Sequence, residues 1–236
     1  MAEPHHRATP LSPAALPRRE FLRVSQGVAL GGALVNLFWV DTARAAIPVS
    51  EGYLLVDTKK CQGCLSCMLA CSLVHEGEAS LSLARIQVLQ DSFARWPDDV
   101  SIEQCRQCVD PRCVSVCPTG ALKADRNHGN VRWVDREKCT GCLMCVKACP
   151  HTPSRATLIP DAKKDAGVRV EKCDLCADAP YHWDKRGGGP AGKQACVEVC
   201  PVGAIKFTEH VPTQDDAGYK VNLRGPVWRE LGYPTD

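Results

Sequence analysis

Large aromatic side chains are scarce in this sequence, making up 6% of its 236 residues. A chain of this length can form one or two modest domains, but so few aromatics leave little bulk for filling an apolar core. Cysteine is abundant instead, with 16 residues. The composition therefore predicts a fold that covalent or metal links hold together as much as an apolar interior does.

An excess of basic residues is also missing. The chain has 29 Lys and Arg against 27 Asp and Glu, and residues 1–45 contain five of the former and three of the latter, which leaves 24 against 24. This balance argues against nucleic acid as a partner. Six cations lie near the cysteines, where each is either partial compensation for a negatively charged bound group or ordinary surface charge: Lys60, Arg106, Arg112, Lys138, Lys147 and Lys172.

Motifs for a catalytic or nucleotide site are lacking as well. No G-x-G-x-x-G motif or phosphate loop follows a predicted strand. The histidines are scattered without metal-ligand spacing, which favours surface or hydrogen-bonded side chains; they include His75, His128, His151, His182 and His210. We therefore predict no catalytic residue in this chain.

The cysteines, by contrast, follow a regular pattern. Residues 139–150 read C-T-G-C-L-M-C-V-K-A-C-P, the run of bacterial ferredoxins in which thiolates hold an iron–sulfur cluster and the last cysteine ligates a second cluster. Gly141 lets the backbone pass close to the inorganic sulfides, and Pro150 ends any helix before it. A zinc ribbon or buried structural thiols are the alternatives, although zinc sites favour two separated C-x-x-C pairs.

Three further runs account for all the remaining cysteines. Their intervals are x2-x2-x3, x2-x4-x3 and x2-x19-x3, so no cysteine is left over for a disulfide framework. The segment C-P-x-G-A-[LI]-K occurs at 117–123 and again at 200–206, which indicates duplicated two-cluster units. The four runs are Cys61, Cys64, Cys67 and Cys71; Cys105, Cys108, Cys113 and Cys117; Cys139, Cys142, Cys145 and Cys149; and Cys173, Cys176, Cys196 and Cys200.

Short strands are predicted between the runs. Apolar alternation indicates strands at 52–57, 84–89 and 203–207, and turn residues between apolar segments indicate hairpins of 121–124 with 131–134 and of 156–159 with 168–170. The segment between Cys176 and Cys196 has turn chemistry and no regular period, which indicates a surface loop.

The N-terminus carries the parts of an export signal. Residues 18–23 read R-R-E-F-L-R, similar to the twin-arginine pattern, and the apolar stretch 24–40 and a small-x-small site at 43–45 follow. We expect export of the folded protein to the periplasm by this route, with a retained signal as the alternative. No apolar stretch in the tail is long enough to span a membrane, so no transmembrane anchor is expected after cleavage.

Taken together, the four spacings resemble those of the four-cluster iron–sulfur subunits of the dimethyl sulfoxide reductase (molybdopterin oxidoreductase) family, over about residues 54–207. In organisation the chain also looks like the exported ferredoxin of the nitrite reductase quinol-oxidising system. The resemblance implies that the first run shares ligands with the fourth, and the second with the third. It also implies four [4Fe–4S] clusters, because Cys142 stands where some relatives have tryptophan and a three-iron cluster.

The ligand sets implied by this resemblance divide the sixteen cysteines into four groups. Cluster 1 takes Cys61, Cys64, Cys67 and Cys200; cluster 2 takes Cys105, Cys108, Cys113 and Cys149; cluster 3 takes Cys139, Cys142, Cys145 and Cys117; and cluster 4 takes Cys173, Cys176, Cys196 and Cys71.

The expected fold class is α+β, with duplicated bacterial-ferredoxin-like modules (two two-cluster units) and loop insertions. The predicted organisation is a signal peptide at 1–45, an outer unit of 46–100 plus 165–210, an inner unit of 101–164, and a C-terminal tail at 211–236.

The function that the resemblance implies is non-catalytic electron transfer through four clusters. The expected partners are a molybdenum- or tungsten-pterin catalytic subunit and a membrane quinone-interacting subunit. The alternative is an independent soluble periplasmic polyferredoxin that shuttles electrons from a membrane quinol dehydrogenase to a separate acceptor. Neither the substrate of the partner nor the direction of electron flow follows from the sequence.

Overall fold

The computed structural model describes residues 47–96, 98–164 and 167–212. Every strand and all but one α-helix in these residues is four residues long, and α2 is the exception with 11. The strands are β1 (Tyr53–Val56), β2 (Gln87–Gln90), β3 (Val100–Glu103), β4 (Leu122–Asp125), β5 (Val131–Val134), β6 (Thr157–Pro160), β7 (Val168–Glu171) and β8 (Ile205–Thr208). The helices are α2 (Ser66–Glu76), α3 (Arg112–Ser115), α4 (Met144–Lys147) and α5 (Ala195–Glu198), with a 3-10 turn η1 (Arg126–His128).

The strands form separate antiparallel pairs rather than one sheet. Three pairs are local, β2–β3, β4–β5 and β6–β7, whereas β1 pairs with β8 from the far end of the described chain. In that pair Tyr53 lies opposite Thr208, and Val56 lies opposite Ile205. The first and fourth cysteine runs are therefore joined through a shared sheet.

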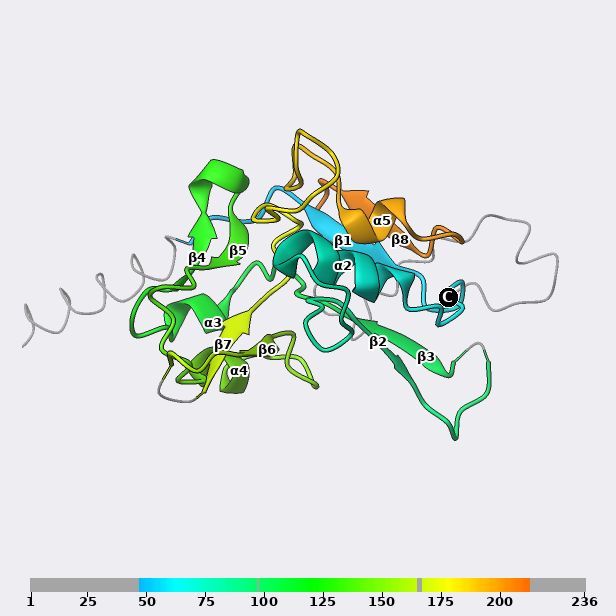
Figure 1. The fold of residues 1–236 in the computed structure, drawn as a ribbon, viewed down its shortest axis with the longest axis horizontal. Coiled ribbons are helices and arrows are strands. Elements are labelled where there is room, and N and C mark those ends of the chain that lie inside the picture. The colour runs from blue at the N-terminus through cyan, green and yellow to red at the C-terminus, as the bar shows by residue number, and fades with distance from the viewer. Residues whose placement is uncertain (1–46, 97, 165–166, 213–236) are drawn as a thin grey trace, which may run out of the picture. The chain divides into compact units, whose positions relative to one another are not determined.

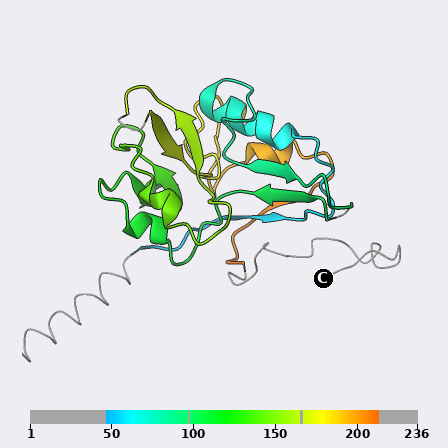
Figure 2. The ribbon, with the colours of Figure 1, turned by 90° about the horizontal axis from the view of Figure 1, so that it is seen from below.

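The helices also pack in pairs, α2 with α5 and α3 with α4. Figure 1 shows α2 and α5 beside β1 and β8, while α3 and α4 lie near the β4–β5 and β6–β7 hairpins. The view from below in Figure 2 keeps the same two groups apart. Each group therefore combines two short helices with strand pairs, as expected for a two-cluster unit.

The turns of the four cysteine runs share one backbone feature. The residue before the second cysteine has positive φ in every run: Gly63 at 66°, Gln107 at 48°, Gly141 at 75° and Leu175 at 59°. This left-handed conformation turns the chain back on itself, so that neighbouring cysteines can face a common centre. At Gln107 and Leu175 it costs about 1–2 kcal/mol, because these residues carry a Cβ atom, and surrounding contacts have to hold it.

The apolar core is small and consists partly of cysteine. One cluster of buried residues combines strand residues such as Leu54, Val88 and Ile102 with cysteines of three runs, and a second combines Leu122, Val134 and cysteines of the inner runs. All sixteen cysteines lie within the described residues and are free thiols. The core is thus organised around thiol groups rather than around aromatic rings.

Most of the predicted elements are confirmed. Both hairpins form, and β1 and β8 lie at the strands expected at 52–57 and 203–207. No helix or strand is assigned to residues 177–193. The α+β fold class with two dicluster modules is confirmed as well, by its small helices and paired strands.

Three expectations differ from the structure. The strand expected at 84–89 begins only at Gln87, because Arg85 donates its backbone N–H to Cys71 Sγ (3.3 Å) instead of to a strand. Strand β3 was not predicted, although its Val100 and Ile102 alternate inward. Helix α2 continues past the last cysteine of its run, since Ser72 is followed by four more helical residues where the other runs have proline.

Several predictions fall outside what the structure describes or are left open by it. The signal peptide at 1–45 and nearly all of the tail at 211–236 lie outside the described residues. The proposed division into outer and inner units stays a prediction, and the β6–β7 hairpin spans its boundary at 164/165. Within the described ranges, no helix combines the length and the apolar character needed to cross a bilayer.

We predict that the cluster-free chain is largely unfolded. Four-residue helices and isolated two-stranded hairpins are too short to be stable alone, so metal ligation must supply much of the folding free energy. Removing iron anaerobically with a chelator should therefore abolish the native far-ultraviolet circular dichroism spectrum, and reconstitution should restore it. A native-like spectrum of cluster-free protein would contradict the prediction.

Candidate functional site

The α-helices place cysteines of one run at two different sites. Cys67 and Cys71 lie four residues apart within α2, on one face of the helix. Cys196 lies in α5, and Cys200 follows it at the same interval. Because α2 and α5 pack together, the third cysteine of each run stays with the first two cysteines of that run, and the fourth reaches the site of the partner run. Helices α3 and α4 repeat the arrangement in the inner runs.

Site 1 is a cavity of about 320 Å³ lined by Cys61, Cys64, Cys67 and Cys200. Apolar side chains, including Val88, Ile102 and Ile205, form much of the remaining wall. Cys64 is exposed and Cys200 is half-buried, whereas the other two thiols are buried. The structure thus brings together the four cysteines predicted for cluster 1, and one of them lies at the surface.

Site 2 is a cavity of about 290 Å³ lined by Cys105, Cys108, Cys113 and Cys149. Its wall is cationic rather than apolar, and contains Arg106, Arg112, Arg132, Arg155 and Lys172. His151 also lines it, with Nε2 at 3.5 Å from Cys108 Sγ. Burial and the neighbouring cations lower the pKa of His151 to about 4, so this imidazole is neutral at physiological pH.

Site 3 is a cavity of about 350 Å³ lined by Cys117, Cys139, Cys142 and Cys145. As at site 1, the wall is mainly apolar, with Leu122, Val134, Leu143 and Val170 among its residues. Cys142 is exposed and Cys117 half-buried. The four cysteines predicted for cluster 3 are therefore gathered around one cavity, which also opens toward the surface through one thiol.

Site 4 comprises Cys71, Cys173, Cys176 and Cys196, all of them buried. Burial raises the pKa of the Cys196 thiol well above its ordinary value, and the neighbouring thiols of Cys176, Cys173 and Cys71 raise it further. Such mutual repulsion indicates that the four sulfurs face one another in a dry environment. A bound metal group would remove this repulsion, because it takes the thiols as deprotonated ligands.

The four sites lie in series. Cys67 of site 1 and Cys71 of site 4 lie one turn apart in α2, and Cys113 of site 2 lies in α3, four residues before Cys117 of site 3. Sites 4 and 2 are joined by Gln107, whose side-chain amide donates to the carbonyl of Cys173 at 2.7 Å. The order along the protein is therefore 1–4–2–3, with the exposed cysteines at the two ends.

The last cysteine of every run accepts a backbone hydrogen bond. Each donor is a backbone N–H that follows its cysteine by 4 to 14 residues, and its nitrogen lies 3.2–3.4 Å from the sulfur. An amide pointing at sulfur stabilises the thiolate form and helps to tune a bound cluster. The pairs are Arg85 N to Cys71 Sγ, Leu122 N to Cys117 Sγ, Arg155 N to Cys149 Sγ and Ala204 N to Cys200 Sγ.

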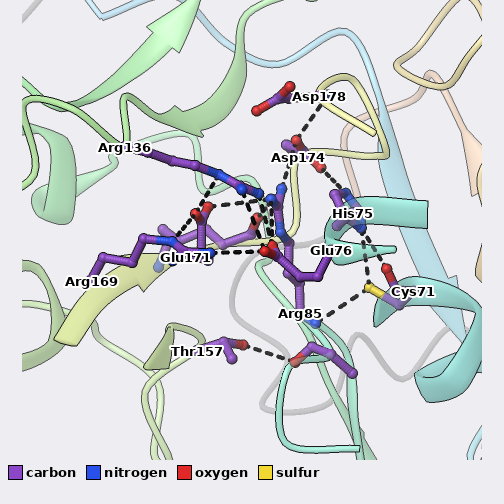
Figure 3. Close-up of polar contacts among 12 residues, drawn as sticks. Cys71, His75, Glu76, Arg85, Arg136, Thr157, Arg169, Glu171, Asp174 and Asp178 are labelled. Atoms are coloured by element: carbon purple, nitrogen blue, oxygen red, sulfur yellow. Dashed lines mark hydrogen bonds and ion pairs between the residues drawn. The ribbon is translucent and has the colours of Figure 1, made fainter. Parts of the chain in front are cut away.

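Beside site 4, Arg85 is the centre of a buried ion network. Its guanidinium lies 2.8 Å from Asp174 and 3.3 Å from Glu171, and Figure 3 shows it between these carboxylates and α2. His75 links the network to α2: its Nε2 lies 3.0 Å from Asp174, and its Nδ1 lies 2.7 Å from the Cys71 carbonyl. Burial alone would raise the pKa of Asp174, but Arg85 and His75 outweigh it and hold that pKa well below its usual range.

Two more arginines extend the network away from the thiols. Arg136 and Arg169 each contact both Glu76 and Glu171, at 2.8–3.1 Å (Figure 3). These residues come from α2, from the segment after β5 and from β7, so the network fastens three parts of the chain to one another. Three arginines thus face the three carboxylates of Glu76, Glu171 and Asp174. Burial alone would lower the pKa of His75, but Asp174 outweighs it and raises that pKa to about 10, so His75 adds a fourth positive charge to the network.

Two buried polar residues at the sites, Gln107 and Arg132, were not singled out from the sequence. Gln107 accepts from the backbone N–H of Arg132 at 2.8 Å while it donates to Cys173. Arg132 in turn donates to the Cys108 carbonyl at 2.8 Å. Of the six cations noted near the runs, Lys172 and Arg106 are buried, whereas Arg112 and Lys138 are about two-thirds exposed. The period-two pattern of β5 could have flagged Arg132, because it places an arginine among apolar neighbours.

Comparison with protein families gives two matches to a 4Fe-4S dicluster domain, at residues 53–118 and 99–210. The two matched segments together contain every cysteine of the chain. Their overlap at 99–118 contains the second run, Cys105 to Cys117. The matches therefore cover the same residues that form the four sites.

Among known proteins, the chain is similar to the hydrogenase-2 operon protein HybA of Escherichia coli O157:H7, with 32% identity over 88% of this chain and 67% of that protein. It is 35% identical to the thiosulfate reductase electron transfer subunit PhsB of Salmonella typhi, over 65% of this chain and 73% of that protein. It is 36% identical to the beta subunit of NADH-dependent phenylglyoxylate dehydrogenase of Aromatoleum evansii, of which the chain spans about a third (33%).

We predict that the ion network is a main source of stability. Replacing the buried Glu171 with glutamine leaves the buried charge of Arg85 and the partly buried charges of Arg136 and Arg169 short of one carboxylate, which should cost about 3–5 kcal/mol. Anaerobic denaturant unfolding, followed by the visible absorbance, measures this loss. The control is Asp110→Asn, which breaks an exposed ion pair with Arg112 at 3.9 Å and should cost less than about 1 kcal/mol. Equal effects of the two substitutions would contradict the prediction.

We also predict about 16 iron atoms per chain after anaerobic purification, four for each site. Cys142→Ala should lower the iron content by roughly one to four atoms and produce a three-iron spectrum at site 3 or no cluster there. The matched control is Thr140→Ala, which changes a neighbouring residue of the same cavity wall that carries no sulfur. Unchanged iron content in Cys142→Ala would exclude this thiol as a ligand.

Proposed function

The chain belongs to the 4Fe-4S dicluster family, and on this basis we propose that it is the electron-transfer subunit of an oxidoreductase whose catalytic centre lies on a partner chain. It carries four [4Fe–4S] clusters and is itself an electron-transfer protein rather than the catalytic subunit. When bound, each cluster takes up and releases one electron. The role of the polypeptide is to hold these groups in series and to shield them from water.

The ligand sets proposed for the four clusters are those of sites 1 to 4. The observation that carries the proposal is the gathering of sixteen free thiols into four groups of four, each with three cysteines from one run and one from its partner run. A single run cannot complete its own site, because its fourth cysteine lies one helical turn away. The proposed pairing of runs is supported by this grouping.

Electron entry and exit are proposed at the two ends of the series. Cys64 at site 1 and Cys142 at site 3 are the exposed ligands, whereas all four thiols of site 4 are buried. Electron transfer between proteins requires close approach of the donor and acceptor groups, so a partner has to dock where a ligand is near the surface. The order 1–4–2–3 then gives one continuous path between two different partners.

The proposed partners follow from the cysteine spacings. Their resemblance to the dimethyl sulfoxide reductase family supports a molybdenum- or tungsten-pterin catalytic subunit at one end and a membrane quinone or quinol partner at the other. The relatives bear the names of hydrogenase, thiosulfate reductase and phenylglyoxylate dehydrogenase systems. Because these systems differ in substrate, the family alone does not select one. The alternative function is a free polyferredoxin that docks transiently with two partners.

The proposed location is the periplasm. The twin arginines Arg18 and Arg19, the apolar stretch at 24–40 and the small residues at 43–45 support export by the twin-arginine route. That route carries folded proteins, which suits a chain whose clusters must be inserted before export.

We expect the chain to co-purify with a metallopterin protein. The test is anaerobic purification at native expression level, followed by native mass spectrometry and by measurement of molybdenum, tungsten and iron. One pterin-containing partner per chain supports the subunit assignment. A monomer with its full iron content supports the free carrier instead, and a stable complex without molybdenum or tungsten contradicts the proposed partner.

A further inference from the structure

The wall of site 2 differs in charge from the walls of the other sites. Four arginines and one lysine line it, and no aspartate or glutamate does. The walls of sites 1 and 3 contain neither lysine nor arginine. At site 4, Arg85 and His75 both contact Asp174, and Arg85 also contacts Glu171. Two cations of the site 2 wall likewise pair with carboxylates outside it, Arg112 with Asp110 and Arg155 with Glu103, whereas Arg132 and Lys172 are in no ion pair with a carboxylate of the described chain.

Two of the cations at site 2 are almost fully buried, Arg132 with 1% and Lys172 with 2% of its surface exposed. Their hydrogen bonds go to backbone carbonyls. Lys172 Nζ donates to Arg155 O at 3.3 Å, and the Arg132 guanidinium donates to Cys108 O and Asn130 O, both at 2.8 Å. Within residues 47–96, 98–164 and 167–212, neither side chain forms an ion pair with a carboxylate.

Buried charges without a counter-ion are strongly unfavourable, because the protein interior solvates them far less well than water does. Something at site 2 must therefore offset two positive charges. The thiolates of Cys105, Cys108, Cys113 and Cys149, together with the iron–sulfur group that they hold, carry the negative charge that the wall lacks. The cations and the bound cluster thus form one buried ionic assembly.

We propose that Arg132 and Lys172 are the counter-ions of the cluster at site 2 and make it the most easily reduced of the four. This inference rests on the proposed electron-transfer function. One-electron reduction makes the thiolate-bound cluster more negative by one charge, and a fixed cation in a low-dielectric interior favours that state. The apolar walls of sites 1 and 3 provide no such cation, and at site 4 Arg85 and His75 already lie against the carboxylates of Asp174 and Glu171.

The inference gives site 2 a distinct role in the series. An electron entering from either end comes to rest at site 2, between sites 4 and 3. The cations also explain why the path does not pass through chemically equivalent centres, although the runs are internal repeats. The repeated runs provide the same cysteine ligands at each site, and the residues between the runs make the sites chemically different.

The test is an anaerobic potentiometric titration of the full, cluster-loaded chain, followed by electron paramagnetic resonance. In Lys172→Met, which keeps most of the apolar stem and removes the charge, the most positive potential should shift downward. At a fixed potential, the reduced-to-oxidised ratio of that centre should fall at least about tenfold, which is about 59 mV for a one-electron couple. Lys172→Arg should restore the ratio to within about threefold of the unsubstituted protein.

The chain offers a closely matched control. Lys138 precedes the first cysteine of its run, as Lys172 does, but its side chain is 63% exposed and lies 3.0 Å from Asp135. Lys138→Met should leave all four potentials unchanged, because solvent and a carboxylate already screen this charge. Equal shifts in the two methionine variants, or no shift in Lys172→Met, would overturn the inference.

A second pair of variants tests the inference even if Lys172→Met does not retain its clusters. Cys108→Ser changes a ligand of site 2 alone, and Cys64→Ser changes a ligand of site 1 alone. The most positive signal should change in the first and stay constant in the second; the reverse would overturn the inference. If the unsubstituted protein binds four clusters but site 2 does not have the most positive potential, only this inference is contradicted. If it binds fewer than four clusters, the proposed function is contradicted.

Discussion

The structure depends on one constraint: no cysteine run can complete a site by itself. In α2, Cys67 faces site 1 and Cys71 faces site 4, and both lie on one face because they are four residues apart. The distance between two neighbouring sites is therefore set by a single helical turn, which is rigid. The partner run must supply the missing thiol in each case, so strands β1 and β8 have to pair across most of the chain. Local helix geometry thereby determines long-range topology.

Charge is the second constraint, because four clusters with their thiolates would place about −8 of formal charge in a small interior. The sites meet this in different ways. Near site 4, three arginines and His75 face three carboxylates, and this network fastens α2 to β7. At site 2, Arg132 and Lys172 are in no ion pair with a carboxylate of the described residues, and their partner is the bound group itself. The same kind of residue therefore stabilises the fold in one place and adjusts a bound cluster in the other.

Much of this arrangement could be predicted from the sequence, because ligand spacing and hairpin patterns are local signals. The cysteine runs, both hairpins and the strands that became β1 and β8 could be identified in this way. The rest depends on residues far apart in the chain. Arg85 has the appearance of a strand residue, yet its amide points to Cys71 and its side chain to Asp174. Gln107 looks like an ordinary spacer between two cysteines, and its role is visible only once Cys173 and Arg132 lie beside it.

Gln107 also shows how the repeats came to differ. The equivalent positions in the first and third runs are Gly63 and Gly141, which adopt positive φ without strain. At the second run the left-handed conformation costs energy, but the glutamine side chain gains two hydrogen bonds that link site 2 to site 4. A glycine there would relieve the strain and lose the link between the two sites. Positive φ at a residue with a Cβ atom is not confined to Gln107, since Leu65, Leu143 and Leu175 adopt it as well. At Gln107 the strained backbone coincides with a side chain that holds site 2 to site 4, and this link distinguishes it from the glycines of the first and third runs.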